Sequence, residues 1–316
     1  MVWKTRVTDL LGIRDPLIEG ALAGIGNADL AAPVSEAGGL GTLTAWTMGT
    51  PEKLRKGIRE VRSRTDNPFA VNLSPTLDPS LQAMLDVAID ERVPVIETAG
   101  SRAVDFGTRV KEAGLIWVHK VQTVRHALAA ERDGADAVCI MGLEGAGLKS
   151  PLALPTLISV ALAARQVRVP IIAAGGIGDA RTFLAALALG AGAVQLGTMF
   201  CAVKECPLSE RRKQVLVEAD PWDPKWRDPI LATSRPEDVQ RLKEAIGTTE
   251  VLRAAGQAED TGIPKEAGTG ALSLAIGFID RVVTVKELID GIISEAEEIL
   301  ANGGIGGWSL VPKSSA

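Results

Sequence analysis

The chain has 316 residues, of which 46% are hydrophobic and 23% are charged, so it holds enough apolar material for a large buried core. A formal net charge of −5, with no basic cluster, argues against electrostatic binding of nucleic acid. The three cysteines predict neither a disulfide framework nor a zinc site, which favours a reducing cytoplasm. We expect no signal peptide, and no uncharged apolar run reaches the ~18 residues that a membrane span requires.

Short apolar runs alternate with longer segments of helical periodicity from the N-terminus to about residue 200. The expected strands are residues 16–20, 39–45, 69–74, 94–99, 115–120, 137–143, 170–174 and 193–200. Helices are expected at residues 51–65, 79–92, 101–113, 123–133 and 179–189. Continuous apolar strands between helices indicate a parallel sheet that is buried on both faces. Eight such units predict an α/β fold, a TIM (β/α)8 barrel, rather than an open doubly wound sheet.

After residue 204 the alternation stops, and the segment up to residue 265 is charged and rich in proline. We interpret residues 205–270 as a small helical insertion, a lid or substrate subdomain, with helices near 209–220 and 236–246 and turns between them. Residues 1–204 then form the barrel. Residues 271–316 contain a last amphipathic helix, 285–302, that returns to the barrel and precedes a flexible tail.

Glycines follow the last two expected strands, at Gly175-Gly176 and at Gly197-Thr198. Barrel enzymes place their sites at the C-terminal ends of the strands. Glycine there lets backbone N–H groups approach a phosphate, and a helix N-terminus adds partial positive charge. Tight turns are the alternative explanation. The pattern predicts a phosphate site but does not distinguish FMN from a phosphosugar.

Polar side chains end other strands. Lys120 can pair with the electron-rich edge of a flavin or with a phosphate, or it can be a solvated surface lysine. Asn72 can donate its amide to a ring atom or form a turn before Pro75. Glu97 and Glu144 can orient a ligand or act as a base, or they can pair structurally with Lys120.

Neither histidine is expected to be catalytic. His119 precedes Lys120 in the fifth strand and should therefore point to the opposite side, while His126 lies inside the following helix. Cys139 lies within a strand and is expected to be part of the core rather than a nucleophile.

Six short motifs together resemble the nitronate monooxygenase family, formerly called 2-nitropropane dioxygenases. They are residues 20–24, 37–41, 71–73, 144–147, 173–177 and 196–198. The resemblance covers residues 5–206 well and the C-terminal helix weakly, and residues 97–100 and 119–126 look closest to a bacterial subgroup with NADH:quinone reductases. It implies an FMN-dependent barrel with a small second domain. The implied FMN contacts are Ala21, Leu22, Ala23, Asn72, Lys120, Gly175, Gly176, Gly197 and Thr198.

The sequence departs from the family pattern where family members carry the histidine that activates the substrate. Leu148 stands at that place, and a leucine can neither accept nor donate a proton. Ala21-Leu22 likewise replaces the usual Pro-Met of the first loop. Lys149 can supply a positive charge if its loop points inward. The candidate catalytic residues are Lys120, Glu144 and Lys149.

The resulting hypothesis is an FMN-dependent oxidoreductase that takes electrons from NADH, NADPH or an organic substrate. A quinone reductase and an enoyl-thioester (acyl-CoA or acyl-carrier-protein) reductase or dehydrogenase with a bulky apolar substrate are alternatives, as is a flavin-binding protein without nitronate activity. A phosphosugar or nucleotide enzyme on the same barrel is disfavoured because residues 142–150 contain no cysteine nucleophile. We expect a small-molecule substrate, no nucleic-acid or membrane partner, and a homodimer, which is common for such barrels.

Overall fold

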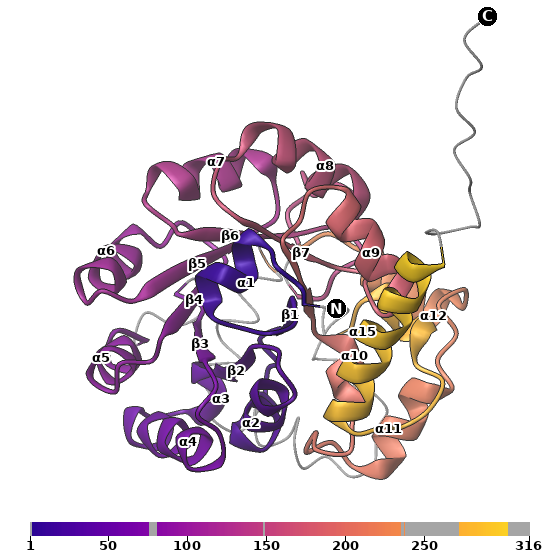
Figure 1. Ribbon diagram of the computed structural model, residues 1–316, viewed down its shortest axis with the longest axis horizontal. Helices are drawn as coiled ribbons and strands as arrows, with labels where there is room; N and C mark the ends of the chain where they lie inside the picture. Colours follow the sequence, from indigo (N-terminus) through magenta and orange to yellow (C-terminus); the bar gives the residue numbers. More distant parts are fainter. Residues whose placement is uncertain (1, 76–80, 148, 235–236, 238–271, 303–316) are drawn as a thin grey trace, which may run out of the picture.

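The computed structural model describes residues 2–75, 81–147, 149–234, 237 and 272–302. A ring of helices surrounds a parallel sheet (Figure 1). The strands are β1 Leu17–Glu19, β2 Gly41–Thr44, β3 Phe69–Leu73, β4 Val95–Ala99, β5 Ile116–Val121, β6 Ala137–Met141, β7 Ile171–Ala174 and β8 Ala193–Leu196. The helices of the barrel are α1 Arg6–Leu11, α2 Ala28–Glu36, α3 Ala45–Met48, α4 Pro51–Arg64, α5 Gln82–Asp90, α6 Val104–Glu112, α7 Val124–Arg132, α8 Thr156–Gln166, α9 Ala180–Ala188 and α10 Thr198–Cys201. The later helices are α11 Glu210–Val217, α12 Pro224–Leu231, the 3₁₀ helix η3 Leu274–Phe278 and α15 Val285–Ala301.

The strands close into the predicted TIM barrel. They run parallel in the order β1-β8-β7-β6-β5-β4-β3-β2, and a parallel bridge between Ile18 and Leu40 joins the first strand to the second. The carboxylate of Glu19 accepts a hydrogen bond from the backbone N–H of Thr42 at 2.9 Å, and the Thr42 hydroxyl donates to the Glu19 carbonyl at 2.7 Å. Burial raises the pKa of Glu19 well above its ordinary value, and the hydrogen bond from the Thr42 backbone opposes the shift.

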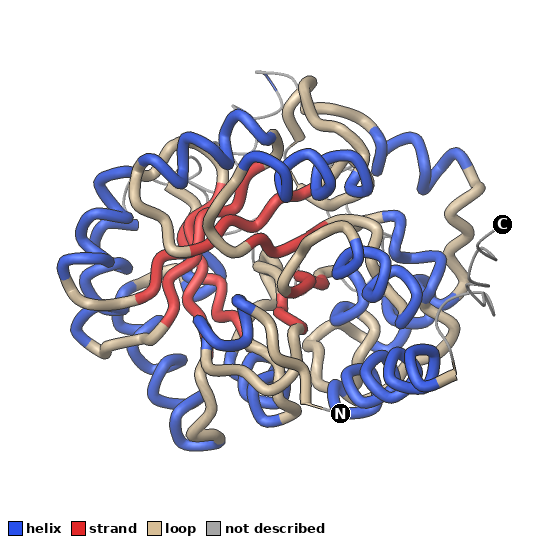
Figure 2. Tube along the Cα trace, turned by 45° about the horizontal axis from the view of Figure 1, so that its top comes forward, coloured by secondary structure: helices blue, strands red, loops and turns tan. Residues whose placement is uncertain are grey.

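The strands lie inside the layer of helices (Figure 2), and a packed core of side chains fills the barrel that they form. Alternate residues of each strand point inward, among them Ile18, Ala70, Val95, Val118 and Ile172. Helix α1 closes the N-terminal end with the buried side chains of Val7 and Leu11. The interior void beside these residues measures only about 10 Å³, so a ligand has no room below the strand ends.

Several elements differ from the sequence-based prediction. β8 ends at Leu196 rather than at residue 200, because residues 198–201 turn into helix α10. Helix α8 was not expected, since residues 150–164 contain no charge that would give the segment a polar face. Helix α2 contains Pro33, and α12 contains Pro229; because proline disfavours the interior of a helix, the sequence did not predict either helix.

After the barrel, α11 confirms the helix expected near 209–220, and α15 confirms the last amphipathic helix. Helix α15 packs against α9 and α2 on the outside of the barrel (Figure 1). The helix expected at 236–246 and the tail lie outside the described residues, and the division at 204 and 270 stays a prediction. In the described part of the chain, no helix is both long enough and apolar enough to cross a membrane.

Candidate functional site at the barrel mouth

A layer of polar side chains crosses the barrel just below the C-terminal ends of the strands. Glu97 on β4 accepts hydrogen bonds from the Asn72 amide at 2.6 Å and from the Gln195 amide at 2.5 Å. The Cys139 thiol lies 3.4 Å from the Gln195 side-chain oxygen. All four residues are at most 4% exposed. The layer therefore forms a rigid polar floor, and anything bound at the mouth rests on it.

Lys120 lies above this floor on β5. Its register partner across the sheet is Cys139, and it belongs to the same inward-facing series as Val118. Burial raises the pKa of the Cys139 thiol to about 12, although the nearby Lys120 charge opposes the shift. Cys139 is thus a protonated core residue, and Lys120 brings a cation to the site.

The two glycine loops leave backbone donors free. Gly175 and Gly176 have φ angles of 104° and 70°, which only glycine adopts without strain. Among the described residues, no protein acceptor is hydrogen-bonded to the backbone N–H of Gly176, Ile177 or Thr198. Unpaired donors in partly or fully buried backbone are costly unless a ligand satisfies them. These loops therefore have the chemistry of an anion site.

The loop after β1 packs beside the loop after β8. The Thr44 hydroxyl accepts from the backbone N–H of Leu22 at 3.0 Å, and the Thr47 hydroxyl accepts from Gly24 at 3.0 Å. A Cβ placed on Gly197 would lie 3.6 Å from the Leu22 side chain. The structure thus brings the predicted residues 21–23 next to the predicted glycine loop at 197.

Glu144 helps to hold the loop after β7. Its carboxylate accepts from the backbone N–H and the hydroxyl of Thr156 at 2.8 and 2.9 Å, which caps the start of α8. A Cβ on Gly176 would lie only 3.0 Å from the Glu144 Cβ. One carboxylate oxygen, Oε2, accepts both of these bonds, so the Glu144 side chain is anchored to the start of a helix.

Lys149 is turned inward, as the sequence analysis required for a role in the site. The residue is 2% exposed, and its ammonium lies 3.3 Å from the Leu143 carbonyl. Burial lowers the pKa of Lys149 to about 8, while Glu144 partly offsets the shift. Its backbone exchanges hydrogen bonds with Ser234, at 2.8 Å in each direction. Leu148 itself lies outside the described residues.

His119 points away from Lys120, as strand alternation predicts. Its Nδ1 lies 2.7 Å from the Thr98 hydroxyl, which also accepts from the Trp117 indole at 2.8 Å. Burial lowers the pKa of His119 to about 4, so the ring is neutral at pH 7. It is a packing residue between the barrel and its helices.

Three residues of the site were not singled out from the sequence. Gln195 stands within an apolar strand two positions before Gly197, a signal that could have revealed it. Thr156 is distant from Glu144 in sequence and follows no strand. The backbone N–H and the hydroxyl of Ser273 donate to the Thr198 hydroxyl at 2.8 and 2.9 Å. The two residues are 75 positions apart in the sequence, so no local pattern predicts this contact.

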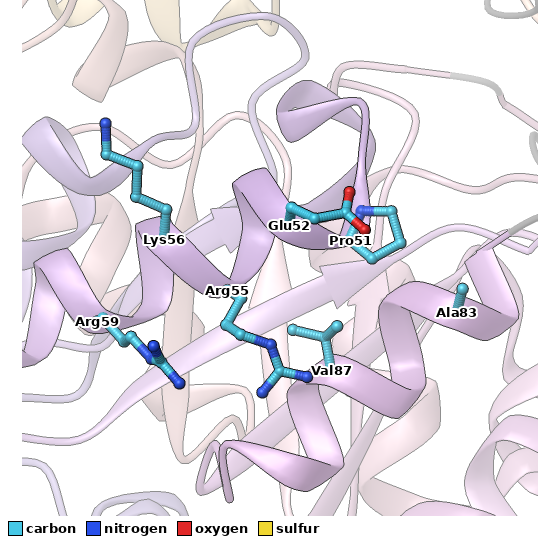
Figure 3. A pocket seen from close by; sticks show the side chains of 7 residues that line it. All are labelled: Pro51, Glu52, Arg55, Lys56, Arg59, Ala83 and Val87. Carbon is cyan, nitrogen blue, oxygen red and sulfur yellow. The ribbon is translucent and has the colours of Figure 1, made fainter.

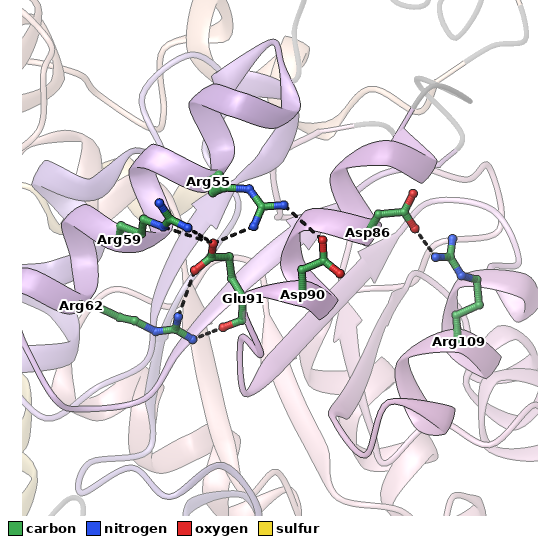
Figure 4. A network of polar contacts seen from close by, with 7 residues as sticks. All are labelled: Arg55, Arg59, Arg62, Asp86, Asp90, Glu91 and Arg109. Atoms are coloured by element: carbon green, nitrogen blue, oxygen red, sulfur yellow. Dashed lines mark hydrogen bonds and ion pairs between the residues drawn. The ribbon is translucent and has the colours of Figure 1, made fainter.

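A separate groove of about 570 Å³ lies on the outer wall between α4 and α5 (Figure 3). Its lining residues are Pro51, Glu52, Arg55, Lys56, Arg59, Ala83 and Val87. Glu91 pairs with Arg55, Arg59 and Arg62 at 2.7, 2.9 and 3.4 Å (Figure 4). Arg59 and Arg55 hold the pKa of Glu91 below its ordinary value. The arginines are thus engaged within the protein, and the groove lies outside the barrel, so we do not place the site there.

The chain is similar in sequence and in structure to known proteins. A family model described as nitronate monooxygenase matches residues 4–84 and 78–295. The structure of FabK from Thermotoga maritima superposes with a TM-score of 0.81 and 34% identity, covering 95% of this chain and 98% of that one. A nitronate monooxygenase of Paraburkholderia phytofirmans is 32% identical over 68% of this chain and 70% of its own length. A (3aS,4S,5R,7aS)-5-hydroxy-7a-methyl-1-oxo-octahydro-1H-indene-4-carboxyl-CoA dehydrogenase of Rhodococcus jostii is 27% identical over 93% of this chain and 96% of its own length.

Proposed function

Because the chain belongs to the nitronate monooxygenase family, and is therefore a flavin-dependent oxidoreductase, we propose that its cofactor is FMN, with the phosphate at Gly175-Gly176 and Gly197-Thr198. The observation that carries this proposal is the set of unpaired backbone N–H groups at Gly176, Ile177 and Thr198. Unpaired donors on two loops that each follow a strand suit a terminal phosphate, and Thr198 also begins a helix. This geometry favours a mononucleotide held by its phosphate.

The floor and walls of the mouth fit the rest of such a cofactor. Asn72 and Lys120 would face the flavin ring, with Lys120 beside the edge where negative charge collects on reduction. Ala21, Leu22 and Ala23 would line one side of it. The flavin supplies hydride or electron transfer. The protein supplies a cation at Lys120 and a floor whose amides are fixed by Glu97.

Two further residues would serve the substrate. Lys149 is buried beside the mouth with a pKa of about 8, so it can offer a proton or a positive charge near neutral pH. Glu144 would act by position, since it caps α8 and contacts the glycine loop that binds the phosphate. Together with Lys120 they make up the proposed catalytic set.

The electron donor is proposed to be NADH, NADPH or the organic substrate, with a nitronate as one substrate class. A specific observation favours a second class, an acyl thioester with a bulky apolar part. The relative that covers 93% of this chain is named for a polycyclic carboxyl-CoA compound, and Leu22 is an apolar residue on the wall of the site. Leucine in place of histidine at 148 also suits an apolar group.

A panel of anaerobic half-reactions separates these classes. The enzyme would be mixed with NADH, NADPH, a propyl nitronate and an enoyl-CoA or acyl-CoA in turn, and flavin absorbance would be followed. Reduction by a nicotinamide and reoxidation by the enoyl thioester would support a reductase. Reduction by the nitronate alone would support a monooxygenase. A flavin that none of these compounds reduces would refute both and leave a flavin-binding protein. A cytoplasmic location and a homodimer remain part of the proposal.

A further inference from the structure

A short strap, residues 272–279, contacts the loops that follow three neighbouring strands, β6, β7 and β8. In the loop after β6, the carbonyl of Glu144 accepts a hydrogen bond from the backbone N–H of Leu274 at 3.0 Å. In the loop after β7, Phe278 packs so closely on Gly178 that an added Cβ there would lie 2.6 Å from its ring. The strap therefore joins the segments that surround the two glycine loops of the anion site.

The contact of the strap with the loop after β8 is a pair of hydroxyl groups. The Thr198 hydroxyl oxygen accepts hydrogen bonds from the backbone N–H and from the hydroxyl of Ser273, at 2.8 and 2.9 Å. The Ser273 hydroxyl in turn accepts from the backbone N–H of Ala275 at 3.3 Å. Thr198 is 2% exposed and Ser273 is 7% exposed, so the surrounding protein shields the pair from bulk water.

One hydroxyl proton of this pair has no acceptor within the described part of the chain. Two hydroxyl groups carry two protons, and a single proton serves the bond between them. Because both lone pairs of the Thr198 oxygen receive donors from Ser273, the proton of Thr198 must point elsewhere. Reversing the shared bond would move the free proton to Ser273 without removing it. A buried O–H group without an acceptor is costly, so the pair requires an acceptor that a ligand can supply.

We propose that Ser273 is a positioning residue of the cofactor site, which orients the Thr198 hydroxyl so that it donates its proton to the phosphate. The inference rests on the proposed function, because it takes the anion at these loops to be the phosphate of FMN. The free hydroxyl proton and an unpaired backbone N–H belong to the same residue, Thr198. A phosphate oxygen is a charged acceptor and forms strong hydrogen bonds with such donors. The strap thereby adds a fixed side-chain donor to the backbone donors of the glycine loops.

Fluorescence titrations of the full-length apoprotein with FMN and with riboflavin, which has the same ring but no phosphate, test the proposal. Ser273→Ala should weaken FMN binding about threefold to tenfold, as the loss of one hydrogen bond implies, and should leave the affinity for riboflavin unchanged. Ser273→Thr retains the hydroxyl and should bind FMN as the wild type does. Because Ser273 acts through Thr198, the variant with both Ser273→Ala and Thr198→Val should bind FMN no more weakly than Thr198→Val alone.

Ser159→Ala is the matched control, because Ser159 is 2% exposed and its hydroxyl donates to the Leu154 carbonyl at 3.2 Å, away from the strap. This variant should keep the wild-type affinity for both ligands. Equal losses of FMN and riboflavin affinity in Ser273→Ala would show a merely structural role and overturn the proposal. Wild-type FMN affinity in Ser273→Ala would also overturn it but leave the proposed cofactor intact. A wild-type protein that does not bind FMN would refute the proposed function, and this inference with it.

Discussion

A glycine pair with the same backbone angle offers a controlled test of the phosphate loop. Gly176 and Gly114 both have φ of +70°, so alanine at either position pays the left-handed penalty of about 1–2 kcal/mol. At Gly114 an added Cβ meets nothing within 4 Å. At Gly176 it would lie 3.0 Å from the Glu144 Cβ and 3.5 Å from its Cγ. Both substitutions therefore carry the same backbone strain, but only Gly176→Ala also crowds the side chain of Glu144.

The difference should appear in both stability and cofactor affinity. Displacing Glu144 weakens its two hydrogen bonds to Thr156, each contributing about 0.5–1.5 kcal/mol. Gly114→Ala should thus lose about 1–2 kcal/mol of unfolding free energy, and Gly176→Ala up to about 2–5 kcal/mol if both hydrogen bonds are lost. Because Gly176 also lies in the proposed phosphate loop, its variant should bind FMN at least about tenfold more weakly.

Urea unfolding and a fluorescence titration of FMN provide the two readouts. Gly114→Ala should keep wild-type affinity for FMN despite its lower stability. The reasoning is refuted if Gly176→Ala binds FMN as the wild type does. It is also refuted if Gly114→Ala loses the same affinity, because backbone strain alone would then explain the effect.

Three further outcomes follow from charges in and near the site. Lys120→Met should weaken FMN binding about 10-fold to 100-fold, as the loss of a charge-assisted hydrogen bond implies, whereas the same change at the exposed Lys56 should leave the affinity unchanged. If titration gives Lys120→Met the affinity of the wild type for FMN, Lys120 has no role in binding the cofactor. Turnover should decline as pH rises through about 8 and become low and flat with pH in Lys149→Met; unchanged turnover in that variant would remove Lys149 from the mechanism. The pKa of His119 is about 4 in the folded state against 6.5 in the unfolded state, so its contribution to stability is complete above pH 6.5 and falls by about 3 kcal/mol toward pH 4. Urea unfolding across this pH range would detect the fall, and His119→Gln should abolish this part of the pH dependence.

The barrel was predictable because its signals are local. Eight apolar runs gave eight strands, and the glycines at 175–176 and 197 marked loops at the correct ends. Alternation along β5 also placed His119 and Lys120 on opposite sides. Each of these inferences needs only the periodicity of one strand and the rule that parallel strands end at the same face.

The contacts that complete the site were not predictable, because they join distant segments. Glu144 was expected to be a free acid or a partner of Lys120, yet it caps α8, a helix that its uncharged sequence concealed. Thr198 receives both of its hydrogen bonds from Ser273, beyond the proline-rich segment. Glu97 lies between Asn72 and Gln195 because barrel closure brings β4 opposite β8.

The identity of the cofactor on the purified protein tests the central claim most directly. The protein should be yellow, release FMN rather than FAD on denaturation, and lose its flavin absorbance when NADH, NADPH or a substrate is added without oxygen. A colourless protein that does not take up FMN would contradict the assignment of Gly175-Gly176 and Gly197-Thr198 as its phosphate site.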